Sequence, residues 1–187
     1  METGKVIFLN GTSSAGKSTL AKEIQKISKE RWFHVQLDTF LHMIHDKFYM
    51  DQKTVLETVN TGASIMHEFI LNLCENGENV ILDTVIENRR ESWLKECARL
   101  LHGVDVLLVR VSCPLHELER RELGRGDRPK GLAEKQLANM SIIKNYDVEV
   151  NTFASTIEEC AKTIESIIKE DVGHKEFIKI YEKYKVA

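Results

Sequence analysis

The chain has 187 residues, of which 42% are hydrophobic and 29% are charged, and this composition is typical of a globular protein rather than a disordered one. Its net charge of −3 argues against a strongly basic nucleic-acid-binding protein, so we expect no nucleic-acid partner. The length suits one domain, and we expect a single domain over residues 1–187.

Strand-like and helix-like segments alternate along the chain. Lys5–Asn10 is a short apolar run that predicts a buried strand, and the apolar spacing within Lys17–Glu30 predicts a helix after it. Further strands are expected over residues 33–38, 79–83, 104–111 and 147–151. Further helices are expected over residues 55–76, 93–101, 114–123, 132–144 and 157–168, with a helical tail over about 174–187. This alternation predicts an α/β fold, a three-layer sandwich around a mainly parallel five-stranded sheet.

The longest apolar stretches have the length of a strand, and even Val104–Val111 contains Asp105 and Arg110. They are much shorter than the roughly 20 apolar residues that a membrane-spanning helix needs. No signal-peptide pattern precedes the first apolar run. The four cysteines are widely spaced and lack metal-binding spacing. We therefore expect a cytoplasmic protein with free thiols and no association with membranes.

The first strand leads into a glycine-rich loop, Gly11–Ser18, that fits the P-loop pattern Gly-x-x-x-x-Gly-Lys-Ser/Thr without a mismatch. In such a loop the backbone N–H groups and the N-terminus of the following helix face the phosphates. Lys17 is expected between the β- and γ-phosphates, and the hydroxyl of Ser18 is expected to bind Mg²⁺. The predicted site for a nucleoside triphosphate comprises Gly11, Thr12, Ser13, Ser14, Ala15, Gly16, Lys17, Ser18 and Thr19.

Asp83 is the second expected ligand of Mg²⁺. It ends the apolar run Asn79–Asp83, and in P-loop proteins a carboxylate at such a strand end lies beside the metal, directly or through a water. Two alternatives stay open. Asp83 could instead cap a helix that begins near Glu87, and Glu87 could take its place at the metal.

Asp38 is expected at the end of the second strand, on the edge of the sheet where parallel α/β proteins bind ligands. A carboxylate there can lie opposite the γ-phosphate, accept the proton of a hydroxyl group and orient its oxygen for in-line attack. The spacing equally allows Asp38 to cap a helix over residues 39–45.

The segment Arg120–Gly131 is expected to form a mobile loop between two helices, because it contains three glycines and a proline. Five basic and two acidic residues give it a local charge of +3. A mobile loop with arginines can act as a lid that closes over the triphosphate, excludes water and stabilises charge in the transition state. The alternative is a solvated basic turn in which Glu122 and Asp127 pair with the arginines.

Four segments of the chain carry a family resemblance: LNGTSSAGKST, LDTF, CPLHELERRELGRGDRPKGLAEKQ and YDVEVNT. They resemble the chloramphenicol phosphotransferase-like family of P-loop kinases, from about Val6 to Ile168. The P-loop is common to many families, whereas RGDR at 125–128 followed by GLAxxQ at 131–136 is far more restrictive.

The resemblance implies a fold like that of the nucleoside-monophosphate kinases and the ATP-dependent phosphorylation of a hydroxyl group. It also implies that Asp38 is the general base. The other catalytic residues that it implies are Lys17, Arg121, Arg125 and Arg128. The chain departs from the family at Leu41–Val59, where an acceptor is expected to bind, and at Asn151, where relatives often have Asp.

The leading hypothesis is therefore a small-molecule kinase, with chloramphenicol as the named candidate acceptor and antibiotic resistance as the implied role, on the resemblance alone. Two alternatives remain. A kinase of the zeta-toxin type would phosphorylate a nucleotide sugar, and a nucleotide-binding regulatory module would bind ATP with little turnover. A homo-oligomer also stays open, because the apolar stripe of Phe177–Tyr184 can dock on its own domain or on a second copy.

Overall fold

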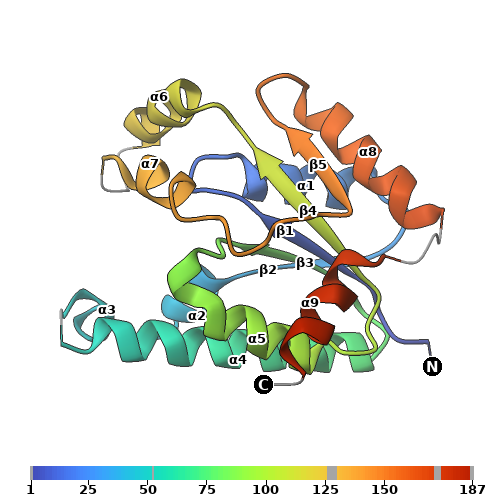
Figure 1. Cartoon of the computed structure of the whole chain (residues 1–187), viewed down its shortest axis with the longest axis horizontal. Coiled ribbons are helices and arrows are strands. Elements are labelled where there is room, and N and C mark those ends of the chain that lie inside the picture. The colour runs from blue at the N-terminus through green and yellow to red at the C-terminus, as the bar shows by residue number, and fades with distance from the viewer. Residues whose placement is uncertain (1, 52, 126–129, 171–173, 186–187) are drawn as a thin grey trace.

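Five parallel strands form the centre of the molecule in a computed structural model that describes residues 2–51, 53–125, 130–170 and 174–185 (Figure 1). The strands are β1 (Val6–Asn10), β2 (Trp32–Gln36), β3 (Asn79–Thr84), β4 (Val106–Ser112) and β5 (Val148–Asn151). The helices are α1 (Lys17–Ile27), α2 (Leu37–Leu41), α3 (Lys47–Met50), α4 (Val55–Glu75), the 3₁₀ turn η1 (Asn88–Arg90), α5 (Glu91–Leu100), α6 (Leu115–Arg125), α7 (Leu132–Leu137), α8 (Ile157–Lys169) and α9 (Glu176–Tyr184).

The strand order in the sheet is β2-β3-β1-β4-β5, and each of the four pairings is parallel. β1 lies at the centre and all five of its residues are buried, as expected for a strand that is covered on both faces. Asn10 at its end is in register with Thr84 of β3 and Arg110 of β4. The carboxyl ends of the central strands therefore meet at one edge of the sheet.

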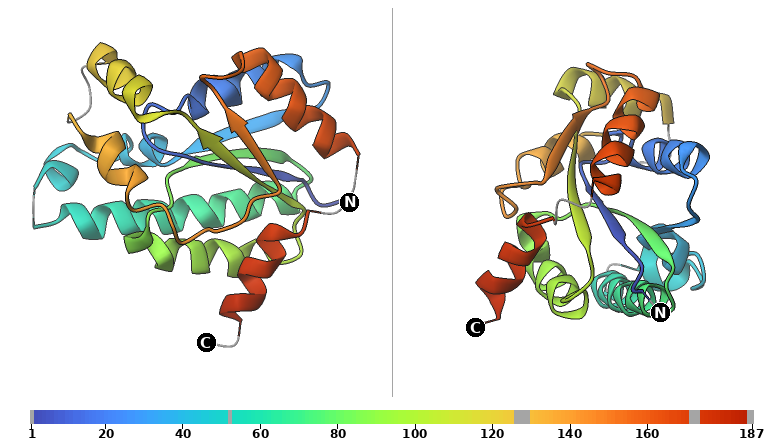
Figure 2. Two further views of the ribbon diagram at one scale, coloured as in Figure 1. Left: turned by 45° about the horizontal axis from the view of Figure 1, so that its top comes forward. Right: turned by 90° about the vertical axis from the view of Figure 1, so that its right-hand side faces the viewer.

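Helices cover both faces of the sheet and bury two hydrophobic clusters (Figures 1 and 2). The first cluster joins β1, β3 and β4 to α4, α5 and α9 through residues such as Phe8, Met66 and Leu94. The second joins the opposite face to α1 and α8 through residues such as Leu20 and Ile164. The predicted three-layer α/β architecture is thus confirmed.

The C-terminal helix α9 packs against its own chain. Phe177 is buried, and its ring centroid lies 5.7 Å from that of Phe8 in β1. His174, just before the helix, has its Nδ1 atom 2.7 Å from Oδ1 of Asp105. The four cysteines are free and buried, as expected. None of the described helices has the length and apolar character needed to cross a membrane.

Several predicted element boundaries differ from the observed ones, and three of these differences bear on the site or on the packing around it. The strand expected over 33–38 ends at Gln36, and the next residues form α2, so Asp38 lies in the first helical turn and is not its N-cap. The helix expected over 132–144 ends at Leu137, because the following residues turn toward the β3–α5 loop, where Asn139 O accepts a hydrogen bond from Asn88 N. The first helix ends at Ile27 rather than residue 30.

Candidate active site

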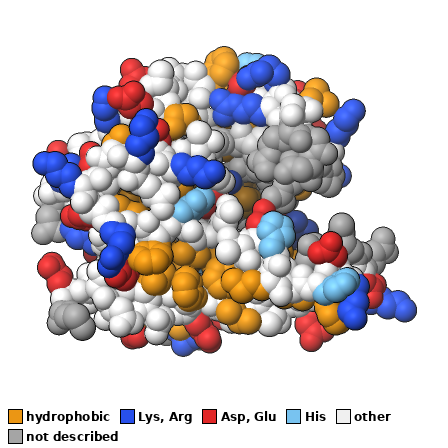
Figure 3. All heavy atoms as spheres, turned by 180° about the vertical axis from the view of Figure 1, so that it is seen from behind, with side chains coloured by type: hydrophobic (Ala, Val, Ile, Leu, Met, Phe, Trp, Pro, Cys, Tyr) orange, Lys and Arg blue, Asp and Glu red, His pale blue; other side chains and the backbone are white. Residues whose placement is uncertain are grey.

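A cavity of about 750 Å³ opens at the carboxyl edge of the sheet. Seen from behind, the surface of the molecule is hollowed across its middle, and hydrophobic side chains gather on the half below (Figure 3). In the ribbon views, α6 and α7 lie at one side of this edge of the sheet and α2 and α3 at the other (Figure 2). The lining includes Ser13, Ser14, Gly16, Lys17, Ser18, Thr19, Lys22, His34, Gln36, Asp38, Asp83, Arg90, Arg121 and Gln136.

The P-loop has the backbone conformation that suits anion binding. Ser14 and Gly16 have positive φ angles of 61° and 89°, and such left-handed positions form concave arrays of N–H groups. A side chain at Gly11 would clash with the backbone of β4, since its Cβ would lie 2.4 Å from Val111 O. The N-terminus of α1 has no side-chain cap and no acidic residue in its first turn. This end of the helix is therefore suited to receive phosphate groups.

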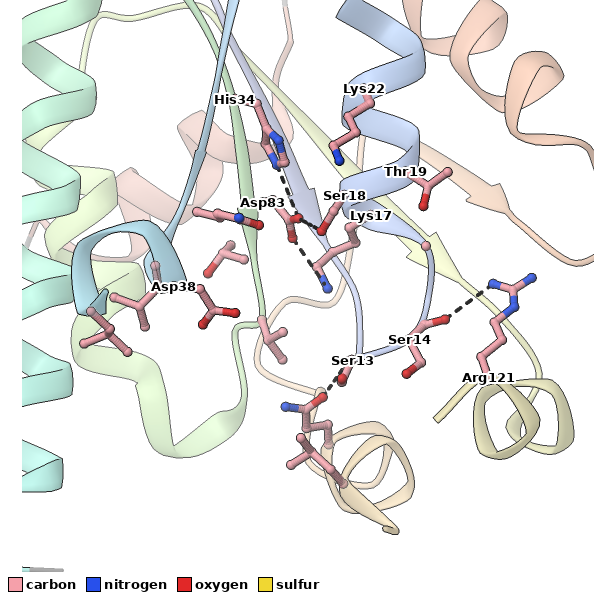
Figure 4. A pocket seen from close by; sticks show the side chains of 18 of the residues that line it. Ser13, Ser14, Lys17, Ser18, Thr19, Lys22, His34, Asp38, Asp83 and Arg121 are labelled. Atoms are coloured by element: carbon pink, nitrogen blue, oxygen red, sulfur yellow. Dashed lines mark hydrogen bonds and ion pairs between the residues drawn. The ribbon is translucent and has the colours of Figure 1, made fainter. Parts of the chain in front are cut away.

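Lys17, Ser18 and Asp83 form one connected cluster at the base of the cavity (Figure 4). Ser18 Oγ donates a hydrogen bond of 2.6 Å to Asp83 Oδ2, and Lys17 Nζ lies 3.6 Å from Asp83 Oδ1. Lys17 Nζ also donates to Thr12 O at 2.9 Å. Asp83 lies within β3 and binds these P-loop residues, so it does not cap a later helix.

The electrostatics of Asp83 favour a metal ligand. Burial alone raises the pKa of its carboxyl, but the charge of Lys17 and hydrogen bonds from His34 and Ser18 outweigh burial and lower the pKa below its ordinary value. Asp83 is therefore an ionised carboxylate beside a hydroxyl oxygen, a donor pair that fits Mg²⁺ when phosphate oxygens complete its coordination. Among the described residues no group of three His, Cys, Asp or Glu side chains could hold a metal ion unaided.

Glu87 does not take this place in the cluster. It is buried, but its Oε2 accepts a hydrogen bond of 2.8 Å from Arg89 Nε and lies 3.7 Å from Arg90 Nε. It is the N-cap residue of η1 and does not line the cavity.

Asp38 lies across the cavity from the P-loop. Its side chain points from α2 toward Lys17 and Ser13, in the space between the two walls (Figure 4). The helix α2, which holds Asp38, packs against α4 at Gly62. A Cβ atom at position 62 would lie 3.1 Å from Leu41 Cδ2. A larger residue there would therefore press on Leu41 and displace α2, which forms this wall of the cavity.

Arg121 lies beside the P-loop, on the side of it remote from Asp38 (Figure 4). Its Nη1 donates to Thr152 Oγ1 at 3.0 Å and to Ser14 O at 3.4 Å, and its Nε donates to Glu117 Oε1 at 2.7 Å. Thr152 Oγ1 in turn donates to Ala15 O at 2.8 Å. These contacts make Arg121 part of the support of the P-loop.

The segment expected to be a lid is only partly described, and its first part, Arg120–Arg125, is the end of helix α6 rather than a loop as expected. Arg128 lies outside the described residues, as does the side chain of Arg125, so their predicted roles stay predictions. Glu122 does not pair with the arginines in the described part of this segment. It accepts hydrogen bonds from Gly131 N at 2.6 Å and Ala133 N at 3.1 Å, and so it caps the start of α7.

Sequence reasoning missed four residues that the structure brings to this site. Gln136 Oε1 accepts a hydrogen bond of 2.6 Å from Ser13 N, and His34 Nε2 lies 3.4 Å from Asp83 Oδ2. The other two are Thr152 and Arg90. Gln136 and Thr152 lie in segments that carry the family resemblance, which is a usable signal. No such signal in the sequence marks His34, which lies in β2, or Arg90, which lies after β3.

Comparison with known proteins places the chain among phosphotransferases. A family model described as "Chloramphenicol phosphotransferase-like protein" matches residues 4–169. A protein of Mycobacterium tuberculosis named "Putative O-phosphotransferase" is 34% identical over 186 residues, which cover 88% of this chain and 82% of that protein.

Two solved kinases have a similar structure. The APS kinase CysC of Mycobacterium tuberculosis gives a TM-score of 0.65 at 19% identity, over 90% of this chain and 99% of that chain. Shikimate kinase of Acinetobacter baumannii gives a TM-score of 0.64 at 16% identity, over 91% of this chain and 96% of that chain. At such low identity these likenesses show a shared kinase-like α/β fold.

Proposed function

Because the chain belongs to the chloramphenicol phosphotransferase-like family, we propose that it transfers the γ-phosphoryl group of ATP to a hydroxyl group of a small molecule. The observation that carries the proposal is the position of Asp38, whose side chain faces Lys17 and the P-loop across the cavity (Figure 4). A carboxylate in that position is well placed to accept a proton from a hydroxyl that attacks a phosphate bound at the P-loop.

The proposed reaction is a single in-line transfer. The acceptor hydroxyl lies between Asp38 and the γ-phosphorus, and its oxygen forms a bond to phosphorus as the bond to the β–γ bridging oxygen breaks. Asp38 takes the hydroxyl proton and later releases it to solvent. The products are a phosphate monoester and ADP.

The P-loop side of the cavity supplies electrostatic stabilisation. Lys17 places its ammonium group where negative charge develops on the transferred group, while the N-terminus of α1 faces the phosphates. Ser18 and Asp83 are the residues that would hold Mg²⁺, which neutralises phosphate charge when bound. Arg121 lines the same cavity and donates to Ser14 O at 3.4 Å, and its predicted role in stabilising the transferred group stays a prediction.

Chloramphenicol is the first acceptor to test, because the family is described by that activity. The assay follows transfer of radiolabel from ATP, with Mg²⁺, to chloramphenicol and to a mixture of small hydroxy metabolites that includes nucleotide sugars. Asp38→Asn is compared with the parent. Asp51→Asn is the matched control, because Asp51 is an exposed carboxylate outside the cavity.

We expect the parent and Asp51→Asn to label an acceptor at equal rates, and Asp38→Asn to be slower by about 10²–10⁴-fold, the usual contribution of a general base. A parent that binds ATP but labels nothing would favour the regulatory-module alternative. Labelling by Asp38→Asn at the parent rate would remove Asp38 from the mechanism. Binding of ATP, measured separately by titration, shows that each variant keeps its P-loop.

A further inference from the structure

Arg90 is a cation in the wall of the cavity that the reaction described above does not use. It lies at the junction of η1 and α5, and its side chain is 23% exposed. It lines the same cavity as Asp38, and the two side chains are near enough for their charges to interact. The preceding residue, Arg89, is 71% exposed and does not line the cavity. Two adjacent arginines therefore have different surroundings.

The protein holds the Arg90 guanidinium in a fixed position. Its Cζ atom lies 4.1 Å from the ring centroid of Trp93, and Nη1 donates to Val85 O at 3.3 Å. Trp93 is itself fixed, because its Nε1 donates to Asn60 Oδ1 at 3.0 Å. The loop before Arg90 is tied to the end of β1, where Asn10 Oδ1 accepts a hydrogen bond from Ile86 N at 2.9 Å. Stacking and anchoring of this kind preorganise a guanidinium for binding.

The described residues neutralise this cation incompletely. Glu87 is the carboxylate beside it, but Glu87 binds Arg89 at 2.8 Å and lies 3.7 Å from Arg90 Nε. Glu87 is thus shared by two guanidinium groups, and Asp38 is the other carboxylate whose charge acts on Arg90. Burial, together with the charge of Arg89, lowers the pKa of Arg90 despite the opposing charges of Glu87 and Asp38. A partly desolvated guanidinium gains most from a ligand that brings an anion.

We propose that Arg90 and Asp38 form a two-point site in which Asp38 receives the acceptor hydroxyl and Arg90 binds an anionic group of the same molecule. The acceptor is then an anionic alcohol that carries a carboxylate, sulfate or phosphate group, rather than a neutral molecule such as chloramphenicol. This inference rests on the proposed function, because it concerns the acceptor of that reaction.

The kinetic test uses Arg90→Gln, with Arg89→Gln as the matched control and Arg90→Lys as the charge-preserving variant. The acceptor labelled by the parent in the metabolite mixture is identified by mass spectrometry, and its KM and kcat are measured for each variant. We expect an anionic acceptor. For Arg90→Gln we expect its KM to rise by about 10- to 100-fold, with the KM for ATP within about twofold. Arg90→Lys should give an intermediate KM, because lysine keeps the charge but not the planar fork.

Other results overturn the inference while leaving the proposed function intact. One such result is that the parent labels a neutral acceptor. A second is that the acceptor KM of Arg90→Gln equals that of Arg89→Gln. A third is that Arg90→Gln lowers kcat without changing KM, which would mean that Arg90 binds the transferred phosphoryl group instead of the acceptor. A chain that phosphorylates nothing contradicts the proposed function instead.

A binding measurement tests the anion site without turnover. The chain has two tryptophans, so Trp32→Phe leaves Trp93, stacked on Arg90, as the only tryptophan fluorophore. With ADP and Mg²⁺ occupying the P-loop, the probe is inorganic sulfate. We expect a saturable change in Trp93 fluorescence that Arg90→Gln abolishes and Arg89→Gln retains. No saturable change, or one that survives Arg90→Gln, overturns the anion site.

Discussion

Gln136 in α7 accepts a hydrogen bond of 2.6 Å from the backbone N–H of Ser13 in the P-loop. The same short helix begins where Glu122 of α6 accepts hydrogen bonds from Gly131 N and Ala133 N. The P-loop, α7 and α6 are therefore joined by side chains that bind backbone groups. A substitution of Glu122 or of Gln136 should therefore alter the position of the P-loop, which is the nucleotide site.

Substitution of Gln136 should weaken ATP binding in a graded way. Gln136→Ala removes one hydrogen bond to the P-loop, and we expect the KM for ATP to rise about fivefold. Gln136→Glu keeps an acceptor oxygen but adds a negative charge beside the phosphates, so its KM should rise further. Lys135→Ala, at an exposed neighbouring position, is the control. Equal KM values for all four proteins would show that α7 does not support the nucleotide site.

Asp83→Asn should affect both Mg²⁺ use and stability. Loss of the carboxylate should raise the Mg²⁺ concentration for half-maximal turnover by about 10- to 100-fold. It also removes the carboxylate 3.6 Å from the buried ammonium of Lys17, so the free energy of unfolding should fall by about 3 kcal/mol. Mg²⁺ titrations and urea denaturation without nucleotide measure the two effects.

Ser18→Ala separates these two effects. It removes the other expected metal ligand but leaves the Lys17–Asp83 ion pair, so the Mg²⁺ requirement should rise while stability changes by only about 1 kcal/mol. An unchanged Mg²⁺ requirement in both variants would contradict the metal site.

The contribution of Glu117 to stability should depend on pH. Hydrogen bonds from Arg120 and Arg121 lower its pKa from the ordinary 4.5 to about 2. The folded state thus favours the ionised carboxylate, and its stabilisation is fully present above about pH 5 and is lost as pH falls from 4.5 toward 2. The difference in free energy of unfolding between the parent and Glu117→Gln should shrink across that range.

Glu119→Gln provides the control for this titration, because Glu119 is exposed on the same helix. A flat difference between the parent and Glu117→Gln would show that the arginine contacts do not persist in solution. Urea denaturation at several pH values between 2 and 6 measures both differences.

The sequence predicted the nucleotide side of the site better than the acceptor side, and for a physical reason. The P-loop is a local structure, in which consecutive residues from Gly11 to Ser18 determine one backbone path. Asp38 depends instead on where an edge strand ends. Within the described part of the chain, β2 is an edge strand that pairs with β3. Its residues His34 and Gln36 face the cavity, so its polar pattern did not mark the change to helix at Leu37.

Arg90 shows the limit of sequence reasoning more sharply. Arg89 and Arg90 are identical neighbours in the sequence, yet only Arg90 stacks on Trp93 and lines the cavity. The difference arises from the packing of η1 against α5 and of α5 against α4, where Trp93 is held by Asn60, about thirty positions away in the sequence. Such tertiary contacts have no counterpart in a motif, so they could not be predicted from spacing.

Asn151 offers a last prediction, because the family resemblance implies Asp at this position. Its Oδ1 accepts hydrogen bonds from Phe153 N at 2.9 Å and Ala154 N at 3.1 Å, and the residue is exposed and does not line the cavity. Asn151→Asp keeps that acceptor oxygen, so kcat, both KM values and the thermal midpoint should stay within error of the parent. Asn151→Ala should cost about 1 kcal/mol of stability, because it removes the side-chain oxygen that accepts two backbone N–H groups of the turn.

Thr152→Val is the contrasting variant one residue later. It removes the hydroxyl that binds Ala15 O and Arg121, so the KM for ATP should rise severalfold, in step with the loss of two hydrogen bonds around the P-loop. A tenfold fall in kcat for Asn151→Asp would instead mean that a carboxylate at 151 reaches the reacting groups. Because the two residues are adjacent, the contrast between the variants shows whether the turn after β5 supports the P-loop through Thr152 alone.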